Sequence, residues 1–457
     1  MATKPRIAKG TRDFNSQQIA NREYIFSTIK SNFKNFGFAP IETPSFELSD
    51  TLLGKYGEEG DRLIFKILNS GDKVKKADLS ALEEGNLSRF SNSLSEKALR
   101  YDLTVPFARY VVQYQNDITS PFKRYQIQPV WRADRPQKGR FQEFYQCDAD
   151  VVGSNSLWQE VEFIQLYDAI FSDLKLDGVT ININNRKILS AIAERIGAQD
   201  KLIDFTVALD KLDKIGSEKV KEEMLQKGIS SEGITILEPL FSLSGDFDTQ
   251  LKSLKLLLGT SEVGSTGIKE LEFISNAIND LELKTATLKL NLTLARGLNY
   301  YTGAIFEVSA PEGVAMGSIG GGGRYDDLTS IFGLKGISGV GISFGLDRIA
   351  LVMEELNLFP KNNQQTTTVL FANFGTNESL YCYKAIQTLR ANGISAELYP
   401  DATKLKKQIT YANKRNIPYV VLVGEEELSN NYFTLKNMIT GSQETVDFPT
   451  LQSRIII

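Results

Sequence analysis

The chain has 457 residues, 42% hydrophobic and 24% charged, with a net charge of −4, so we expect two or three domains rather than one core. No apolar run approaches the roughly 18 residues that cross a bilayer, and the N-terminus MATKPRIAKGTRDF lacks a secretory signal. The chain contains no histidine, which excludes Ser-His-Asp and Cys-His nucleophiles and histidine-ligated catalytic zinc. Cys147 and Cys382 lie too far apart in sequence to suggest a disulfide framework or metal site, so a reducing, cytoplasmic location is expected.

The first predicted element is a helix after KGTRDF, because apolar residues recur at helical spacing over residues 19–36. Asn15 or Ser16 is its expected cap, and Gly37 its expected end. FAPIETPSFE reads as an extended strand broken by prolines. Residues 69–98 are polar and predict an irregular surface excursion between strands. LTVPFARYVVQY predicts a helix with proline in its first turn.

The segments RYQIQPVWRAD and FQEFYQCDADVVG alternate polar and apolar residues, which predicts two antiparallel strands joined by the basic loop RPQKGR. Gln146, Asp148 and Asp150 share one face of the second strand, an arrangement that a plain apolar core would not use. Arg132 and Arg140 can clamp phosphate oxygens, because a guanidinium offers two parallel hydrogen bonds. The alternative is that both are solvated residues at the rim of a hairpin.

The amino-acid composition changes over residues 190–285, where Lys, Glu and Leu dominate. This composition predicts an inserted module of amphipathic helices. Strand patterns return at LKLNLTLARG, YTGAIFEVSA, GSIGGGG and GVGISFG, followed by a helix from Leu346. After the polar linker NQQTTT, strands and helices alternate and predict a compact α/β domain. The expected domains are therefore a core at 1–189 and 286–362, interrupted by the insertion, and a C-terminal domain at 366–457.

Three further stretches are candidates for ligand binding. GSIGGGGRYDDL is neither a Walker loop nor a dinucleotide fingerprint, so its glycines indicate either close approach to a ligand or a bulge. GVGISFGLDRI places Arg348 just inside a helix, where it favours an anion unless it is simply solvated. ARGLNYYTG places Arg296 beside Tyr300 and Tyr301, and strand alternation predicts that only one of these tyrosines faces a pocket.

Together and in this order, these stretches resemble the histidyl-tRNA synthetases, a family of class II aminoacyl-tRNA synthetases. KGTRDF is similar to the N-terminal signature of that family, and GFAPIETPSFE resembles motif 1 with its proline at Pro44. The hairpin over residues 122–150 resembles motif 2, and GVGISFGLDR resembles motif 3 with its arginine at Arg348. The resemblance covers nearly the whole chain.

The histidine-specific signatures are similar too: LRYDLT, the pair Gln146 and Asp150, ARGLNYYTG and GGGGRYDDL. Two positions depart from the pattern, with Asn299 where aspartate is usual and Asp102 where glutamate is often found. The resemblance implies an α+β fold, with a class II antiparallel catalytic sheet, a helical insertion and a C-terminal α/β anticodon-binding domain. Its motif 1 implies a homodimer.

By resemblance, the chain is a histidine–tRNA ligase that activates L-histidine with ATP and transfers it to the 3′ end of tRNA(His). No catalytic histidine is then needed, because the substrate carboxylate is already ionised and positioning dominates the reaction. The implied histidine-binding residues are Asp102, Leu103, Thr104, Gln146, Asp150, Tyr300 and Tyr301. The implied ATP-binding residues are Arg132, Asp134, Arg140, Phe144 and Arg348, with Arg132, Arg296 and Arg348 catalytic. Mg²⁺ is the implied metal.

The resemblance also assigns roles within the amino-acid site. Asp102, Thr104 and Gln146 would hold the α-ammonium group through charge-assisted hydrogen bonds. Asp150 and Tyr301 would contact the two ring nitrogens, one as acceptor and one as donor. Such a site rejects ligands that leave its polar groups unpaired.

Two other functions are compatible with parts of the pattern. A non-catalytic paralogue, such as the regulatory subunit of ATP phosphoribosyltransferase, could sense histidine in the same pocket without activating it. The three arginines and the full C-terminal domain count against that alternative. A bare tRNA-binding protein would not need the ATP-site arginines, although the lysine-rich stretch at 404–415 fits either RNA phosphates or solvent.

Overall fold

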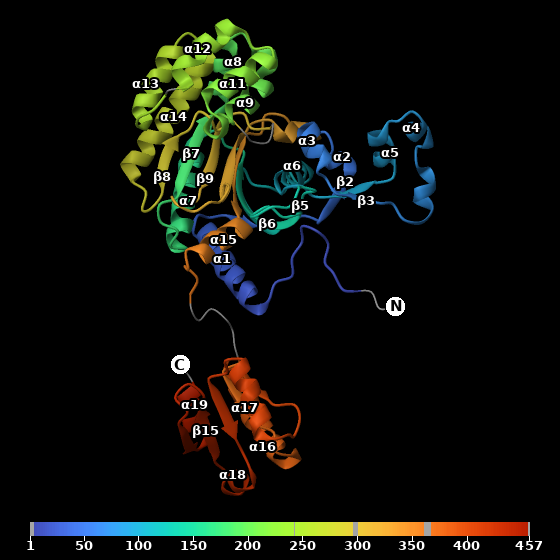
Figure 1. The fold of residues 1–457 in the computed structure, drawn as a ribbon, viewed down its shortest axis with the longest axis vertical. Coiled ribbons are helices and arrows are strands. Elements are labelled where there is room, and N and C mark those ends of the chain that lie inside the picture. The colour runs from blue at the N-terminus through green and yellow to red at the C-terminus, as the bar shows by residue number, and fades with distance from the viewer. Residues whose placement is uncertain (1–3, 242, 296–299, 361–366, 456–457) are drawn as a thin grey trace. The chain divides into compact units, whose positions relative to one another are not determined.

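The computed structural model describes residues 4–241, 243–295, 300–360 and 367–455, and it divides into two compact units (Figure 1). The first unit is Met1–Pro360 and the second is Lys361–Ile457. Over the described ranges, no helix combines the length and apolar character needed to span a membrane. The two units are described separately below.

The first unit is built on an eight-stranded sheet in the order β1-β5-β6-β11-β10-β9-β7-β8. The inner pairings are antiparallel, while the edge strands β1 and β8 pair in parallel with their neighbours. The strands are β1 (Ala39–Pro40), β5 (Phe122–Trp131), β6 (Glu143–Val152), β7 (Thr180–Asn185), β8 (Thr287–Leu290), β9 (Ala304–Ser309), β10 (Gly320–Tyr325) and β11 (Gly339–Gly345). The two antiparallel strands expected on either side of RPQKGR are confirmed as β5 and β6.

Helices cover the large sheet on both faces. On one face lie α1 (Ser16–Asn35), α7 (Trp158–Asp173) and α15 (Leu346–Glu355), which share the main apolar core with the sheet. A separate apolar cluster on the other face centres on α6 (Thr104–Gln113). The predicted cap of α1 is confirmed, because the Asn15 side chain accepts a hydrogen bond from the third helical amide in a capping box.

Strand β6 explains how the two faces differ. Its odd-numbered residues Cys147, Ala149 and Val151 are buried in the main apolar core. Because side chains alternate along a strand, Asp148 and Asp150 point to the opposite face, although both are almost fully buried. One face of the sheet therefore holds the unit together, and the other carries buried charge.

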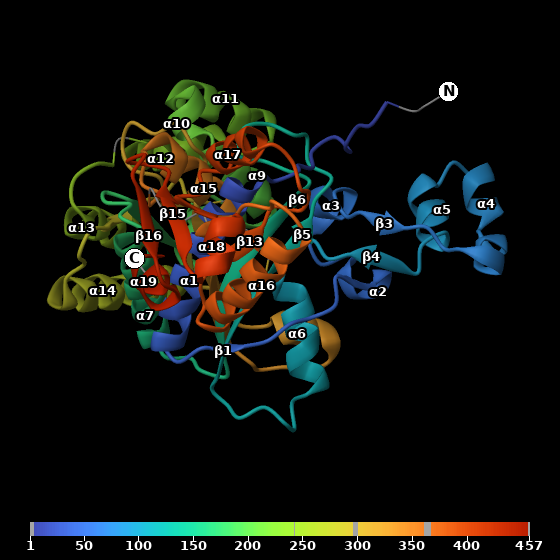
Figure 2. The same cartoon turned by 90° about the horizontal axis from the view of Figure 1, so that it is seen from below.

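A small three-stranded sheet, in the order β2-β4-β3, extends from this unit (Figures 1 and 2). It comprises β2 (Phe46–Leu48), β3 (Lys66–Ile67) and β4 (Lys97–Leu99). Along the chain, β2 is followed by α2 (Ser49–Leu52) and α3 (Gly57–Arg62), and β4 is followed by α6. The proline-broken strand expected in motif 1 is thus two short strands in different sheets.

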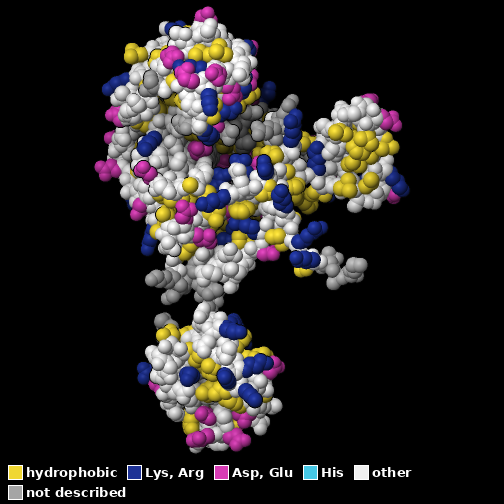
Figure 3. Space-filling model, in the orientation of Figure 1, with side chains coloured by type: hydrophobic (Ala, Val, Ile, Leu, Met, Phe, Trp, Pro, Cys, Tyr) yellow, Lys and Arg dark blue, Asp and Glu magenta, His cyan; other side chains and the backbone are white. Residues whose placement is uncertain are grey.

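The segment between β3 and β4 corrects the prediction of an irregular excursion. It contains a 3₁₀ helix at Gly71–Lys76, α4 (Leu79–Glu83) and α5 (Leu87–Ser93). Asp78 and Asn86 cap the two α-helices by accepting hydrogen bonds from backbone amides. The prediction from polar composition did not consider these caps. Figure 3 shows hydrophobic side chains gathered on this part of the molecule. The exposed ones are Leu68, Val74, Leu79, Leu82 and Leu87.

Amphipathic helices expected between residues 190 and 285 are present and lie together at one end of the unit (Figure 1). They are α8 (Arg186–Arg195), α9 (Leu202–Leu209), α10 (Leu212–Ile215), α11 (Ser217–Gln226), α12 (Ser231–Phe241), α13 (Phe247–Leu258) and α14 (Glu262–Leu281). In α13, Leu251, Leu254 and Leu258 are buried, whereas Leu256 is 90% exposed. The domain boundary predicted at residue 190 falls inside α8.

The second unit has a five-stranded sheet in the order β13-β12-β14-β15-β16, parallel around β12 and antiparallel beyond β14. Its strands are β12 (Val369–Phe371), β13 (Ala396–Leu398), β14 (Tyr419–Leu422), β15 (Phe433–Asn437) and β16 (Gln443–Val446). Its helices are α16 (Thr376–Ala391), α17 (Leu405–Lys414), α18 (Glu425–Asn430) and α19 (Phe448–Ile455). The alternation expected from the sequence is confirmed, with α18, β16 and α19 as elements that were not predicted.

Candidate functional site

A pocket lies on the charged face of the large sheet. Carboxylate, amide and hydroxyl side chains line it, which suits a small polar ligand. Six of the seven predicted histidine-binding residues line it: Asp102, Thr104, Gln146, Asp150, Tyr300 and Tyr301. The seventh, Leu103, is fully buried and does not line the pocket.

The strand register brings the polar residues of the pocket together. Arg124 of β5 pairs with Asp150 of β6, and Gln126 pairs with Asp148. On the other side of β6, Gly341 and Ser343 of β11 take the same register positions. Sequence reasoning did not select Arg124, although the alternation of KRYQIQ places it on this face.

Glycines of β10 and β11 keep the floor of the pocket open. A Cβ atom on Gly341 would lie 1.9 Å from Oδ1 of Asp150, far inside van der Waals contact, so any larger residue would displace that carboxylate. The run of four glycines begins β10, which pairs regularly with both neighbouring strands. The regular pairing excludes the bulge interpretation of GSIGGGG, while close approach of a ligand to these glycines stays a prediction.

Asp102 lies two residues before the start of α6 and is almost fully buried. Its Oδ1 accepts hydrogen bonds from the Tyr56 hydroxyl at 2.9 Å and the Val105 amide at 3.1 Å. Its Oδ2 accepts a longer one from the Tyr300 hydroxyl at 3.4 Å. Burial raises the pKa of Asp102, while these hydrogen bonds and the charge of Arg132 oppose the rise.

Asp150 has a partner on each carboxylate oxygen. The Tyr325 hydroxyl donates to Oδ1 at 2.7 Å, and the Arg124 guanidinium forms an ion pair with Oδ2 at 2.7 Å. Arg124 is fully buried, and its guanidinium carbon lies 4.1 Å from the centroid of the Phe107 ring. Tyr325 belongs to the GGGGRYDDL signature, but sequence reasoning did not select it as a site residue.

Asp148 lies between Gln146 and Asp150 on β6 and also lines the pocket. Its Oδ1 is buried and has no hydrogen-bond partner among the described residues, and the same holds for Oε1 of Gln146. The Gln146 amide donates to the Ser343 hydroxyl at 3.1 Å. Burial raises the pKa of Asp148 to about 7, with the charge of Arg124 opposing that rise.

Both tyrosines of ARGLNYYTG line the pocket, which makes the prediction that only one would do so wrong. Their ring centroids are 4.9 Å apart, with the planes at 63°. They precede β9 in a turn and a coil rather than a strand, so strand alternation does not separate them. Burial raises the pKa of both Tyr300 and Tyr301, and both hydroxyls therefore stay protonated at neutral pH.

Arg132 follows the end of β5, beside the pocket. Its Nε donates to the Tyr101 carbonyl at 3.0 Å, and its guanidinium carbon lies 4.2 Å from the Tyr101 ring centroid and 5.2 Å from that of Phe144. Because its charge also acts on Asp102, Arg132 connects the pocket to the cationic group described next.

Two backbone carbonyl groups orient the Arg348 side chain. Its Nε donates to the Gly139 carbonyl at 2.8 Å, and its Nη1 donates to the Ser318 carbonyl at 2.6 Å. Burial lowers the pKa of Arg348, and the positive charges of Arg140 and Arg132 lower it further. Three guanidinium groups therefore share one neighbourhood, which attracts a polyanion.

Two further predicted site residues remain, of which the structure describes Asp134 but not Arg296. Asp134 lies 3.8 Å from Arg140 in an ion pair, and its carbonyl accepts a hydrogen bond from the Gln142 side chain at 3.0 Å. Arg296 falls outside the described residues. The helix that carries Arg348 is tied to the N-terminal KGTRDF segment, since Asp347 forms ion pairs with Arg12 and with Arg22.

Family models match both parts of the chain. A model described as "Histidyl-tRNA synthetase" matches residues 86–349, and one described as "Anticodon binding domain" matches residues 368–456. A protein of Christiangramia forsetii named histidine–tRNA ligase is 67% identical, with 100% of both chains covered. A protein of the same name from Flavobacterium johnsoniae is 62% identical, again over 100% of both.

A solved structure shares the fold. The crystal structure of histidyl-tRNA synthetase from Nostoc sp. PCC 7120 superposes with a TM-score of 0.80 at 29% identity, over 99% of each chain. These matches confirm the predicted α+β architecture of a large mixed sheet with helices and a C-terminal anticodon-binding domain. The chain belongs to the histidyl-tRNA synthetase family of class II aminoacyl-tRNA synthetases.

Proposed function

We propose that the pocket on the charged sheet face binds L-histidine and that the neighbouring arginines bind ATP, so that the chain forms histidyl-adenylate. The histidyl group then passes to the 3′ end of tRNA(His). The observation that carries this proposal is adjacency. An acidic pocket lies next to a group of three guanidinium side chains. The charge of Arg132 acts on Asp102 in the pocket and on Arg348 in the arginine group.

The acidic side of the pocket suits an α-ammonium group. Asp102, Thr104 and Gln146 line it together, and charge-assisted hydrogen bonds from an ammonium group are about twice as strong as neutral ones. Tyr301 also lines the pocket, with a protonated hydroxyl that can donate to an unprotonated ring nitrogen. Asp150 lines the same cavity.

The arginines supply charge where the reaction develops it. Arg132 is placed to bind the substrate carboxylate and the α-phosphate, and Arg348 and Arg140 to bind the outer phosphates. The carboxylate is ionised at neutral pH, so the attack needs no general base and depends on positioning and charge stabilisation. Arg296 would stabilise the α-phosphate from the other side. The Phe144 ring centroid lies 5.2 Å from the Arg132 guanidinium carbon, so Phe144 would help to position this arginine.

Mg²⁺ is part of the proposal as an ion held chiefly by ATP. The described residues contain no group of three or more carboxylate, thiol or imidazole side chains suited to a metal, but Mg²⁺ needs only one or two carboxylates beside phosphates and water. Asp134 and Glu307 are near enough to act on the charge of Arg348 and are the candidate ligands. When bound, the ion neutralises charge on the leaving pyrophosphate.

The partners follow from the family. The second unit would bind the tRNA anticodon, and the adenylate site would receive the terminal adenosine, which implies a cytoplasmic location beside the ribosomes. A homodimer is expected to form through motif 1, where Phe46 and Leu48 are 46% and 61% exposed. Large apolar side chains in such a segment are suited to an interface.

A regulatory, non-catalytic role is not favoured. The full-length relatives at 62–67% identity are named histidine–tRNA ligase, and Arg132, Arg140 and Arg348 remain grouped as a nucleotide site requires. A protein that only senses histidine has no use for that group.

Histidine-dependent exchange of pyrophosphate into ATP tests the proposal. We expect exchange with wild-type protein and Mg²⁺, and its loss by at least 10³-fold in Arg296→Ala because transition-state charge is left without a partner. Binding of tRNA should remain nearly intact. Arg89→Ala, which removes an exposed arginine of α5, is the control and should exchange normally. Wild-type protein that binds histidine without exchange would support the sensor instead.

A further inference from the structure

We propose that Arg12 is a positioning residue of the nucleotide site, which holds the β5–β6 loop (residues 132–142) against helix α15. The loop carries Arg132 and Arg140, and α15 carries Arg348. Arg12 therefore sets how these three guanidinium groups converge on the phosphates of a nucleoside triphosphate. The inference rests on the proposed function, and it gives a task to the KGTRDF segment, to which that function assigns none.

Arg12 contacts the loop and the helix at the same time. Its guanidinium carbon lies 3.4 Å from the centroid of the Phe141 ring in the loop, close enough for a cation–π interaction. Its Nη2 donates to Oδ1 of Asp347, in the first turn of α15. The Asp347 side chain is 5% exposed and that of Arg12 is 28% exposed. One partly solvated cation thus joins a buried carboxylate of the helix to an aromatic ring of the loop.

The backbone just before Arg12 is fitted to the same loop. The Gly10 carbonyl accepts a hydrogen bond from the Gln142 amide at 2.8 Å, and the Gln142 carbonyl accepts one from the Arg132 amide at 3.0 Å. Gly10 has a φ of +84°, and a Cβ atom there would lie 2.6 Å from Cγ of Gln142. A larger residue would be strained and would push the loop away. The KGTRDF segment is therefore shaped to follow this loop.

The loop and the helix are joined at two places. Arg348 itself makes one join, because its Nε donates to the Gly139 carbonyl at 2.8 Å. Arg12 makes the other, between Phe141 in the loop and Asp347, the sequence neighbour of Arg348. One hydrogen bond at Gly139 leaves the loop free to pivot about it, and the second join removes that freedom. A misplacement of about 1 Å can cost roughly 100-fold in rate, so the second join matters most where phosphates are held.

Arg22 offers a matched comparison, because it shares the carboxylate of Asp347 but stacks elsewhere. Its Nη1 donates to the same Oδ1 at 2.5 Å, and its side chain is 9% exposed. Its cation–π partners lie in the KGTRDF segment, in α1 and in β6. Loss of Arg22, the more deeply buried of the two arginines, should cost more stability. Loss of Arg12 should disturb the nucleotide site more.

The test compares Arg12→Gln and Arg22→Gln with wild type in histidine-dependent pyrophosphate exchange and in thermal unfolding. We expect Arg12→Gln to lower kcat/KM for ATP about 10- to 100-fold. Its Kd for histidine in the absence of ATP should change by less than about threefold. Arg22→Gln should lower the Tm more and kcat/KM for ATP less, an order that stability alone does not produce. If both variants lose ATP efficiency in proportion to their Tm, Arg12 is only structural and the inference fails.

Binding of AMP and of ATP with Mg²⁺ locates the effect along the nucleotide. AMP lacks the outer phosphates that Arg140 and Arg348 are proposed to bind. The ratio of the Kd for AMP to the Kd for ATP should therefore fall about 10-fold in Arg12→Gln, the scale of one hydrogen bond to a charged group. A ratio equal to that of wild type would show that Arg12 does not position these arginines, and the inference would fail.

Phe141→Leu removes the same contact from the side of the loop. It should lower kcat/KM for ATP with little change in Tm, and it carries the test if Arg12→Gln does not fold. Combined with Arg12→Gln it should add little, because both changes remove one interaction. Fully additive losses would contradict the inference.

Lys9→Gln, an exposed change in the same segment, is the control and should exchange like wild type. Wild-type protein without exchange would defeat the proposed function. Wild-type exchange with an unaltered kcat/KM for ATP in Arg12→Gln would defeat only this inference.

Discussion

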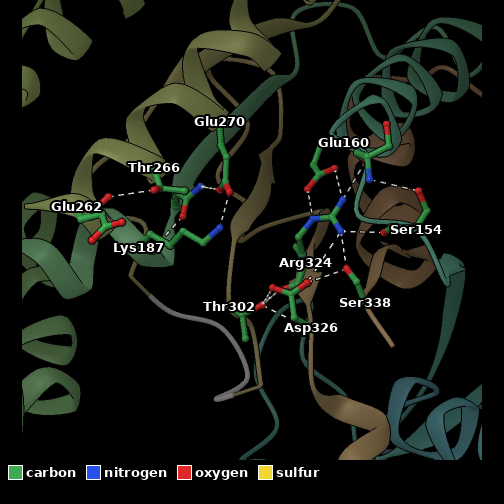
Figure 4. A network of polar contacts seen from close by, with 12 residues as sticks. Ser154, Glu160, Lys187, Glu262, Thr266, Glu270, Thr302, Arg324, Asp326 and Ser338 are labelled. Atoms are coloured by element: carbon green, nitrogen blue, oxygen red, sulfur yellow. Dashed lines mark hydrogen bonds and ion pairs between the residues drawn. The ribbon is translucent and has the colours of Figure 1, made fainter. Parts of the chain in front are cut away.

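Two of the buried guanidinium–carboxylate clusters in the described part of the first unit differ in how completely they are paired. In one, Arg324 of β10 meets Glu160 of α7 through two hydrogen bonds at 2.5 and 2.6 Å. The backbone carbonyl of Ser154 and the hydroxyl of Ser338 take further donors at 3.1 and 2.6 Å (Figure 4). Every nitrogen of Arg324 thus has a partner.

The second cluster is Arg124 with Asp150 and Asp148. Only Asp150 pairs closely with Arg124, whose Nε has no hydrogen-bond partner among the described residues. Asp148 keeps an unpartnered oxygen as well. Since both clusters are equally buried, burial does not separate them. The paired cluster locks α7 to the sheet, and the incompletely paired one faces the pocket, where a ligand can finish it.

The largest effect is expected from Glu160→Leu, which leaves the Arg324 charge buried without its carboxylate. The free energy of unfolding of the first unit should fall by about 3–5 kcal/mol, measured by urea denaturation. The double variant Glu160→Leu with Arg324→Met should recover part of that loss, because the unpaired charge is removed. A double variant no more stable than the single one would contradict the structural role of this pair.

Arg124→Met should lower both stability and binding, because it leaves the Asp150 carboxylate buried without its ion-pair partner. Because the charge of Arg124 lowers the pKa of Asp148, its removal should raise that pKa above 7 and leave the carboxylate protonated at neutral pH. We expect the KM for histidine at pH 7 to rise roughly 10- to 100-fold and to recover partly at pH 9. A rise that does not depend on pH would mean that Arg124 only supports the fold.

Asp148→Asn should stabilise the protein, but only when the carboxylate is charged. The folded pKa of about 7 lies above the unfolded value near 3.9. The destabilising contribution of this one carboxylate is therefore absent below about pH 4, grows as pH rises to about 7 and is constant above that. We expect the Tm of the variant to exceed that of wild type by about 2–4 °C at pH 8 and to match it at pH 4. Differential scanning fluorimetry at both values checks this difference.

The smallest effect is expected where an ion pair is exposed. Lys255 and Glu272 are 2.7 Å apart between α13 and α14, with their side chains 47% and 43% exposed. Such pairs contribute about 0–1 kcal/mol, so Lys255→Ala should shift the urea midpoint very little. A loss comparable to that of Glu160→Leu would show that exposure does not separate the two kinds of pair.

The sequence identified some residues of the pocket and missed others, because the missed ones depend on how distant segments of the chain lie in space. Asp102, Gln146 and Asp150 were found because their motifs carry them. Arg124 was missed because a lone arginine in an alternating strand gives no sign of what lies opposite it. The prediction for Tyr300 and Tyr301 failed because it assumed a strand where the backbone turns.

The helices of the β3–β4 segment show a similar limit. Polar composition predicted an irregular excursion, yet Asp78 and Asn86 cap two short helices there. Short helices depend on caps and packing more than on residue preferences. A composition-based prediction therefore had little information about them.

By itself, the sequence determined the alternation that divides β6 into an apolar and a charged face, and the motifs that identify the family. These are local patterns, set by strand periodicity and residue chemistry. Only the tertiary structure decided which buried charges are paired, because Arg124 and Tyr325 reach Asp150 from distant parts of the chain. Pairing depends on what lies within about 3 Å of each oxygen, and residue order alone does not specify those neighbours.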